Sequence, residues 1–201
     1  MKGSRKLCRA ISVSETIRSF IAFDLDNESV LKKITDLKLS LAKTGADLKL
    51  VEPKNIHITL RFLGNITPNM IDRVFEEMKK VQFTPFNANL HGVGVFPNVH
   101  YPKVLWVGIT DGAEQLRGIF EQLEPRLRSL GFAPDSKGFN PHLTIARVRS
   151  GRNKAEIARS VSENAEYTFG IVKADCLRLK KSDLTPKGPI YSTLREFCPQ
   201  R

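Results

Sequence analysis

Cysteine is scarce in this sequence, and its spacing argues against two common ways of stabilising a small fold. The 201 residues contain three cysteines, an odd number, and no Cys-x-x-Cys pair. A disulfide framework and a zinc finger are therefore both disfavoured. We expect Cys8, Cys176 and Cys198 to be chemically inert. A Gly-rich phosphate-binding loop and low-complexity segments are also absent from the sequence.

Long apolar runs are missing as well. No stretch of about 18 apolar residues, the length that crosses a bilayer as a helix, occurs anywhere in the chain. The basic first residues lack the apolar segment of a signal peptide. These absences predict a cytoplasmic, soluble protein with no membrane partner.

Acidic residues are the minority among the charged ones. The chain has 32 Lys and Arg against 21 Asp and Glu, so its formal net charge at pH 7 is +11. A field of this sign attracts polyanions, and nucleic acid is the commonest polyanion inside a cell. A generally basic surface without a nucleic-acid ligand would give the same composition. With 41% hydrophobic residues, the chain is otherwise typical of one compact domain or two small fused lobes.

Patterns typical of strands and helices alternate along the chain. Residues 1–17 are polar and basic and predict a flexible arm before a folded domain at 18–201. Several predicted strands are joined by turns too short for a crossover helix, which favours an α+β fold with antiparallel sheets. Pro125 is expected to kink the third helix or to start a new turn. We predict strands at 18–24, 47–51, 56–63, 86–96, 104–110, 142–148, 168–179 and 190–197, and helices at 30–41, 71–78, 116–130 and 154–161.

Two of the four histidines lie in matching contexts. One reads Asn55-Ile-His57-Ile-Thr59 and the other Asn140-Pro-His142-Leu-Thr144, so both contain His-x-Thr-x with an aliphatic x. Side chains alternate faces along a strand, so each His shares a polar face with its Thr while the aliphatic residues pack on helices. A lone strand histidine is usually a structural hydrogen-bonding residue. The repetition favours a shared chemical role instead.

Two imidazoles that face each other suit acid–base chemistry on a phosphoester. One takes a proton from the attacking oxygen while the other gives a proton to the leaving oxygen. The hydroxyls of Thr59 and Thr144 are able to donate to the non-bridging phosphate oxygens as charge builds there. His and Thr alone make a poor metal-ligand set, so we expect no metal and no cofactor.

These motifs resemble those of the two-histidine (2H) phosphoesterases, specifically the LigT-like RNA 2′,3′-cyclic phosphodiesterases once called 2′-5′ RNA ligases. The likeness covers nearly the whole chain after residue 17, and the arm 1–17 extends beyond the usual start of the family. Segments that support it besides the two motifs are Gly92-Val-Gly-Val-Phe-Pro97, Pro102-Lys-Val-Leu-Trp-Val-Gly108 and Ser182-Asp-Leu-Thr-Pro-Lys-Gly-Pro-Ile-Tyr191.

The resemblance implies a fold, a site and a partner. The fold would be two pseudo-symmetric lobes, each an antiparallel β-sheet backed by helices, with a central active-site cleft. His57 would be the proton donor and His142 the proton acceptor when water opens the cyclic phosphate to a 2′-phosphomonoester. The motifs alone leave this division of labour open. The implied partner is RNA with a 2′,3′-cyclic phosphate end, such as a tRNA fragment, and the implied state is a monomer.

Two arginines follow the motifs, and strand alternation places them on different faces: Arg61 on the face of its histidine and Arg147 on the opposite face. Arg61 shares the parity of His57 and is expected to reach a phosphate in the cleft, a solvated charge at the rim being the alternative. Arg147 has the parity of Leu143 and Ile145, so it reaches the cleft only if a β-bulge re-aims it. We favour that placement for Arg147.

Other candidates carry weaker signals. His91 and His100 lack a Thr partner and are expected to be ordinary strand and loop residues. Exposed aromatic residues are able to stack on bases, although Trp106 fits a core position better. The aromatic candidates are Phe96, Tyr101 and Trp106, and the loop lysines expected near the cleft are Lys54, Lys103, Lys137 and Lys187.

Three functions therefore fit the sequence. The first is metal-independent hydrolysis of RNA cyclic phosphate ends, and the second is a reversible 2′-5′ RNA ligase that uses the same two histidines. The third is a non-catalytic RNA-binding module of the same fold. The intact pair of motifs argues against the third, because binding alone does not need two imidazoles.

Overall fold

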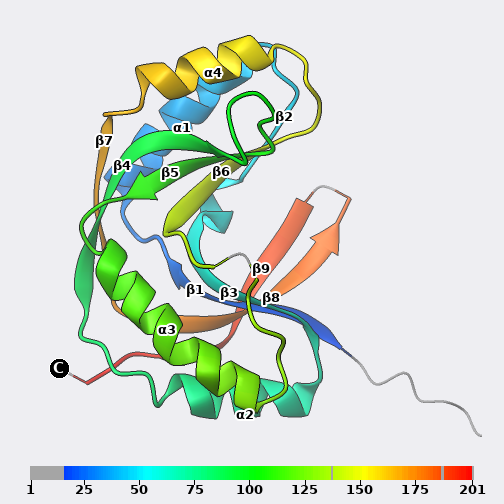
Figure 1. Cartoon of the computed structure of the whole chain (residues 1–201), viewed down its shortest axis with the longest axis vertical. Helices are drawn as coiled ribbons and strands as arrows, with labels where there is room; N and C mark the ends of the chain where they lie inside the picture. The colour runs from blue at the N-terminus through cyan, green and yellow to red at the C-terminus, as the bar shows by residue number, and fades with distance from the viewer. Residues whose placement is uncertain (1–15, 137, 187, 201) are drawn as a thin grey trace, which may run out of the picture.

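The computed structural model describes residues 16–136, 138–186 and 188–200 (Figure 1). Its elements, in chain order, are β1 (Ile17–Asp24), α1 (Glu28–Lys43), β2 (Leu48–Leu50), the 3₁₀ turn η1 (Pro53–Asn55), β3 (His57–Ile66), α2 (Pro68–Met78), β4 (Phe86–Phe96), β5 (Val104–Ile109), α3 (Ala113–Ser129), β6 (His142–Val148), α4 (Lys154–Glu163), β7 (Thr168–Ala174), β8 (Leu177–Thr185) and β9 (Gly188–Phe197).

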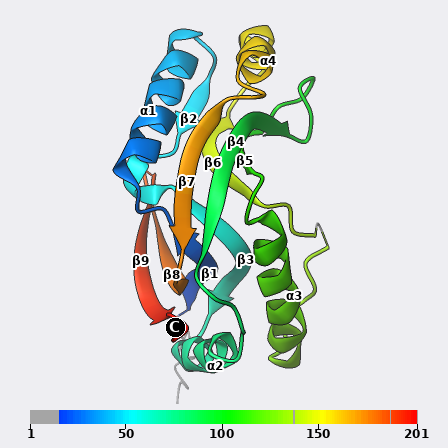
Figure 2. The ribbon, with the colours of Figure 1, turned by 90° about the vertical axis from the view of Figure 1, so that its left-hand side faces the viewer.

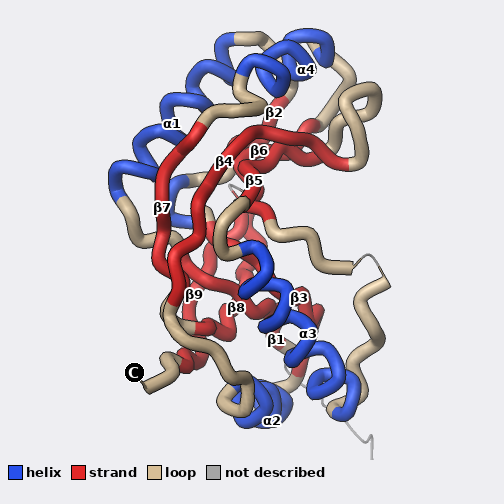
Figure 3. Tube along the Cα trace, turned by 60° about the vertical axis from the view of Figure 1, so that its left-hand side comes forward, coloured by secondary structure: helices blue, strands red, loops and turns tan. Residues whose placement is uncertain are grey.

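Every strand pairing in the described part of the chain is antiparallel, which confirms the predicted α+β class. The strands follow the order β7-β4-β5-β6-β3-β1-β8-β9, with the short β2 paired to β6. We call β7-β4-β5-β6 with β2 the β6 lobe, and β3-β1-β8-β9 the β3 lobe. Between β6 and β3 the register contains one pair, Ile58 with Leu143. The sheets of the two lobes therefore meet at this pair. Figure 3 draws the strands of both lobes in red.

The helices cover the two sheets in an exchanged arrangement. α1 follows β1 of the β3 lobe in sequence but packs on β7 and β6 of the other lobe, where α4 lies on β4. α3 follows β5 of the β6 lobe but packs on β3 and beside α2, which covers β8 and β9. Figure 2 shows α1 and α4 at one end and α2 and α3 at the other. Each lobe is therefore covered by a helix whose preceding strand belongs to the other.

Local sequence explains where the helices begin. The side chain of Asn27 caps α1 by accepting from the backbone amides of Ser29 and Val30. Thr67 caps α2 in the same way, and Pro68 at the first helical position has no amide hydrogen to satisfy. α3 continues as one helix through Pro125, so no new turn begins there.

Some predicted boundaries were wrong. The single strand predicted at 168–179 is two strands, β7 and β8, separated by Asp175 and Cys176. Ile17, assigned to the arm, is the first residue of β1, and residues 1–15 of that arm lie outside the described residues. Within the described ranges, no helix combines the length and the apolar composition needed to cross a membrane.

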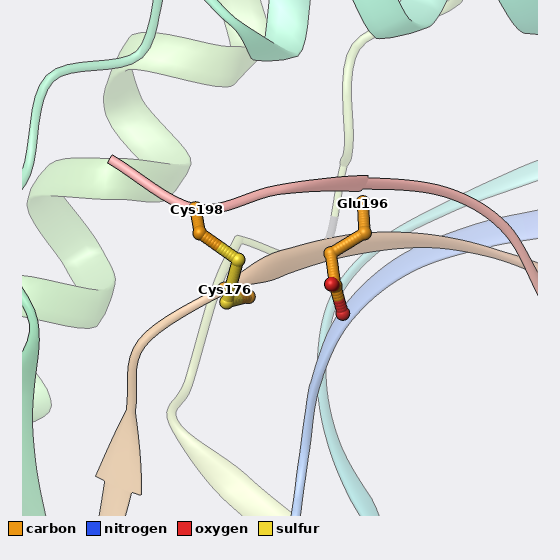
Figure 4. Close-up of side chains that lie close together, drawn as sticks. All are labelled: Cys176, Glu196 and Cys198. Atoms are coloured by element: carbon orange, nitrogen blue, oxygen red, sulfur yellow. A yellow bond between two sulfur atoms is a disulfide. The ribbon is translucent and has the colours of Figure 1, made fainter. Parts of the chain in front are cut away.

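The sequence disfavoured a disulfide framework, but two of the cysteines are paired. Cys176, just before β8, and Cys198, just after β9, form a disulfide (Figure 4). The two strands pair along their length from Leu177 with Phe197, so the cysteines are brought together by the register of the hairpin. The spacing of 22 residues carries no motif that would reveal this pairing. Cys8 lies outside the described residues.

We expect the disulfide to stabilise the protein by restricting the unfolded chain. Closing a loop of 22 residues contributes about 3 kcal/mol to the free energy of unfolding. Cys198→Ser should lower that free energy by this amount in urea unfolding experiments. With excess reductant the two proteins should become equally stable. A Cys198→Ser protein as stable as the unmodified chain under oxidising conditions would show that the disulfide contributes nothing.

Candidate active site

The two histidine motifs meet where the lobes join. The antiparallel pair Ile58–Leu143 places the residues on either side opposite each other, His57 facing Thr144 and Thr59 facing His142. Ile58 and Leu143 are fully buried, so these four polar side chains share the other face of the sheet. All four line one cavity of about 330 Å³.

A β-bulge in β3 removes Arg61 from this cavity. Ala22 of β1 pairs with Thr59 and Ile21 pairs with Arg61, so Leu60 is an extra residue that shifts the alternation by one. Arg61 consequently lies on the helix-covered face, where its guanidinium donates to the Glu124 carboxylate of α3 and to the carbonyl of Ala133. The expectation that Arg61 faces the cleft is therefore not met.

The same bulge brings Phe62 into the cavity in place of Arg61. Phe62 lines the cavity, and 53% of its surface is exposed. An exposed aromatic face in the lining of this cavity offers a stacking surface to a nucleobase. Strict strand alternation placed Phe62 on the helix-packed face, so sequence reasoning missed it.

A matching bulge in β6 turns Arg147 toward the cavity. Trp106 of β5 pairs with Thr144 and Leu105 pairs with Ala146, so Ile145 is the extra residue. Ile145 and Ala146 are both buried, and Arg147 lines the cavity with His142 and Thr144. Arg147 is therefore in the cavity because of a bulge, as we favoured.

Each imidazole is fixed by a hydrogen bond to the backbone two residues before it. His57 Nδ1 is 2.8 Å from the carbonyl oxygen of Asn55, and His142 Nδ1 is 2.7 Å from that of Asn140. A carbonyl oxygen only accepts, so Nδ1 carries the proton in both rings. The neutral rings therefore keep the lone pair on Nε2. Asn55 also donates its side-chain amide to the carbonyl of Pro189, which holds β9 beside the cavity.

Aromatic rings surround both imidazoles. His57 lies 4.8 Å from the ring of Phe20 and 5.2 Å from that of Tyr191, the second contact edge-on. His142 lies edge-on to Phe96 at 5.0 Å, and Trp106 is 6.5 Å away. Phe96 and Trp106 thus pack around His142, which limits the rotation of its ring.

The buried setting favours the neutral form of both histidines. Burial lowers the pKa of His57 from 6.5 to about 4, partly opposed by the hydrogen bond to Asn55, and the ammonium of Lys180 lowers it further. Burial also lowers the pKa of His142, and the Arg147 guanidinium acts in the same direction. A bound anion would raise both pKa values because it favours the charged imidazolium.

Cations gather on one wall of the cavity. Lys49 on β2 and Arg149 after β6 line it together with Arg147. Sequence reasoning missed Lys49 and Arg149, because β2 is only three residues long and its pairing with β6 cannot be predicted locally. The arrangement offers three positive side chains, three hydroxyls and two imidazoles to an anionic group, and the lining also contains the carboxylate of Glu52.

The remaining candidates lie elsewhere. His91 is in β4 and His100 in the loop after it, as expected. Lys54 pairs with Glu52 and lines a larger cavity of about 420 Å³ that contains neither motif. Lys103 borders a third cavity, and Lys137 and Lys187 lie outside the described residues.

Among the described residues, one cluster has the composition of a metal site. It consists of Cys176, Glu196 and Cys198 (Figure 4). Both sulfurs are committed to the disulfide, and Glu196 pairs with Arg178 at 2.6 Å. This cluster contains neither motif histidine.

Comparison with known proteins agrees with this geometry. The LigT like phosphoesterase family matches the chain twice, over residues 25–106 and 107–191, so each match contains one histidine motif. The chain is 39% identical over 164 residues to an RNA 2′,3′-cyclic phosphodiesterase of Aeropyrum pernix, covering 82% of this chain and 93% of that protein. It is also 39% identical over 181 residues to the enzyme of that name from Archaeoglobus fulgidus, covering 90% and 99%.

Solved structures share the fold. The crystal structure of TT0787 from Thermus thermophilus matches with a TM-score of 0.75 and 26% identity over 90% of this chain and 97% of that one. Escherichia coli LigT in its apo form matches with a TM-score of 0.74 at 19% identity, over 92% and 98%. The chain belongs to the LigT-like phosphoesterase family, a two-lobed fold of the 2H type.

The opposite placements of the two arginines give a matched test. Arg61→Met should lower the free energy of unfolding by about 3 kcal/mol, because it leaves the half-buried Glu124 without its partner. Arg147→Met should change stability by about 0.5 kcal/mol or less. It should weaken sulfate binding about tenfold, because a charge-assisted hydrogen bond is lost. Urea unfolding and calorimetric titration with sulfate measure the two effects, and an exchange of the two phenotypes would contradict the bulge assignments.

Anion binding should take up a proton at His57. Its pKa is about 4 in the free protein and rises when an anion binds, so affinity increases as the pH falls from about 6.5 toward 4. Sulfate keeps its charge over this range, and its dissociation constant should fall by up to about tenfold per pH unit at constant ionic strength. His57→Gln should flatten this dependence, leaving any contribution from His142. A sulfate affinity independent of pH in the unmodified protein would exclude protonation of the imidazoles.

Proposed function

We propose that this protein is an RNA 2′,3′-cyclic 3′-phosphodiesterase, which hydrolyses cyclic phosphate ends to 2′-phosphomonoesters without a metal ion. The observation that carries the proposal is the pair of imidazoles on the walls of one cavity, each with Nδ1 bonded to a carbonyl and Nε2 left for a ligand. The names of the relatives described above support the cyclic phosphate as the reacting group.

The proposed reaction is an in-line displacement at phosphorus. His142 Nε2 takes a proton from water as the water oxygen attacks, and His57 Nε2–H gives its proton to the leaving 3′ oxygen. The bond from phosphorus to the 3′ oxygen breaks, the bond to the 2′ oxygen remains, and one water molecule is consumed. His142 ends protonated and His57 neutral, so proton exchange with solvent restores the starting state.

Protonation of His57 follows from substrate binding. The phosphodiester carries one negative charge, which raises the pKa of His57 above its value of about 4 and supplies the acid that the reaction needs. Thr59 and Thr144 are placed to donate to the non-bridging oxygens, and Arg147 adds positive charge where negative charge develops. The order of the two histidines rests on the family resemblance, because the two motifs are built alike.

The substrate we propose is the end of a single RNA strand, such as a tRNA fragment, in the cytoplasm. One chain supplies every residue assigned a role, so a monomer suffices. A 2′-5′ RNA ligase would use the same histidines with an RNA 5′-hydroxyl in place of water. Analysis of the products separates the two reactions, since only hydrolysis leaves a terminal 2′-phosphate.

We expect His57→Ala and His142→Ala each to lower kcat on a cyclic-phosphate-ended oligonucleotide by about 10²-fold or more. The double variant should be little worse than either single variant, because the two residues act as a unit. Thr59→Ala should lower kcat less than either histidine variant, since the phosphate keeps its other hydrogen-bond donors. Turnover is measured with excess chelator present throughout. Activity that disappears with chelator and returns with a divalent ion would disprove the metal-independent mechanism.

A leaving group that needs no proton separates the two histidine roles. A nucleotide phosphodiester with a p-nitrophenolate leaving group should restore turnover to His57→Ala but not to His142→Ala. The reverse pattern would show that His142 is the acid and His57 the base, with the same reaction. Normal cleavage by both variants on the natural ester would reject the proposed catalytic pair.

A further inference from the structure

We propose that the third cavity, which Lys103 borders, binds the nucleotide that precedes the RNA terminus. This cavity of about 240 Å³ is lined by His100, Tyr101, Pro102, Lys103, Ser150 and Lys154, together with the backbone at Gly151. The inference rests on the proposed function, because it assigns this cavity to the same RNA strand. We call it the upstream subsite.

The upstream subsite and the catalytic cavity are lined by residues that are neighbours along two chain segments. Arg149 lines the catalytic cavity, and the next residue, Ser150, lines the upstream subsite. Val104, which follows Lys103, pairs with Arg147, and the amide of Val148 donates to the carbonyl of Lys103. Arg147 thus lies opposite Val104 and Val148 opposite Lys103, so residues one or two positions apart at this end of β5 and β6 line the two cavities.

The side chains of the upstream subsite suit a base and a phosphate together. Tyr101 has 70% of its surface exposed, so its ring is accessible to a ligand. The Lys154 ammonium lies 5.8 Å from the centre of its ring. A nucleobase stacks on a tyrosine face regardless of its sequence, and ammonium groups attract the phosphate beside it. No acidic residue is among the described residues that line this cavity.

Both walls of the upstream subsite are anchored without a ligand. The Asn98 side chain accepts from the backbone amides of His100 and Tyr101, which fixes the loop that carries the tyrosine. On the other wall, the residue before Lys154 is Asn153, and its side chain donates to the carbonyl of Thr44. A pre-formed surface loses little conformational entropy when a strand binds.

The direction of the strand follows from the chemistry. The cyclic phosphate occupies the 2′ and 3′ oxygens of the last nucleotide, so the chain leaves the catalytic cavity through the 5′ oxygen. The next phosphate and base are therefore the groups that reach the upstream subsite. A cyclic mononucleotide lacks both and is unable to use it.

Kinetics with two substrates test the inference. A tetranucleotide with a 2′,3′-cyclic phosphate end should have a kcat/KM about tenfold above that of 2′,3′-cyclic AMP, through a lower KM. Tyr101→Ala should remove most of this difference in kcat/KM and leave kcat/KM for cyclic AMP unchanged. Lys154→Glu should also lower the ratio and reduce the salt dependence of KM for the tetranucleotide, because a phosphate contact is lost.

Lys79→Glu is the matched control. Lys79, which directly follows α2, lies 5.4 Å from the ring of Phe75, a similar lysine–aromatic contact with the same charge change, and it lines neither cavity. The ratio of kcat/KM for the tetranucleotide to kcat/KM for cyclic AMP should be the same in Lys79→Glu as in the unmodified protein. A ratio lowered equally by Lys79→Glu and Lys154→Glu would show only the effect of overall charge and would overturn the inference.

A binding measurement separates failure of the inference from failure of the proposed function. Fluorescence anisotropy with a labelled tetranucleotide ending in 2′-phosphate gives its affinity without turnover, and competition by 2′-AMP gives that of the mononucleotide. The tetranucleotide should bind more tightly than 2′-AMP, and Tyr101→Ala should abolish this difference. That result supports the upstream subsite even if the protein cleaves neither substrate. Equal affinities, or losses by Tyr101→Ala that are equal for both ligands, reject it even if hydrolysis is confirmed.

Discussion

The pairing of Ile58 with Leu143 is the contact on which the rest of the site depends. Within the described residues it is the one registered pair between β3 and β6, and it lies between both histidines and both threonines. A shift of one residue at this pair would exchange the polar and aliphatic faces of a whole strand. The buried Ile58 and Leu143 resist that shift, because it would expose both to the cavity and bury the imidazoles.

Two bulges then determine which later residue of each motif strand enters the cavity. In each motif strand the extra residue comes directly after the threonine, Leu60 in β3 and Ile145 in β6. The residue five positions after each histidine therefore enters the cavity. That residue is Phe62 on one side and Arg147 on the other. A site built from two similar halves thereby acquires an apolar wall and a charged wall, which gives the bound group a direction.

The motifs, the antiparallel class and most element positions were predictable because they follow from local patterns. The faces of His57, Thr59, His142 and Thr144 followed from strand alternation over two residues, a distance that no bulge interrupts. Arg61 could not be placed, because a bulge depends on the partner strand, and nothing in the local sequence marks Leu60 as extra. The disulfide was missed for a related reason. Cys176 and Cys198 meet only through the full register of β8 against β9.

Electrostatics and burial oppose each other in the cavity. Lys49, Arg147 and Arg149 attract an anion, yet burial and neighbouring cations keep the imidazoles neutral until that anion arrives. The charge that the reaction needs on His57 is thus produced by the substrate itself. This coupling avoids burying an isolated imidazolium in the cavity, where its desolvation would lower stability.

The exchange of α1 and α3 between the lobes has a consequence for how the protein folds. Neither sheet is able to cover its apolar face with helices from its own strands alone, because α1 crosses to the β6 lobe and α3 to the β3 lobe. The core of each lobe forms only when the other is present, which predicts one cooperative unfolding transition and a high share of contacts distant in sequence. The same interlocking opposes a hinge that would open the cleft widely, since such a motion would pull both helices from their sheets.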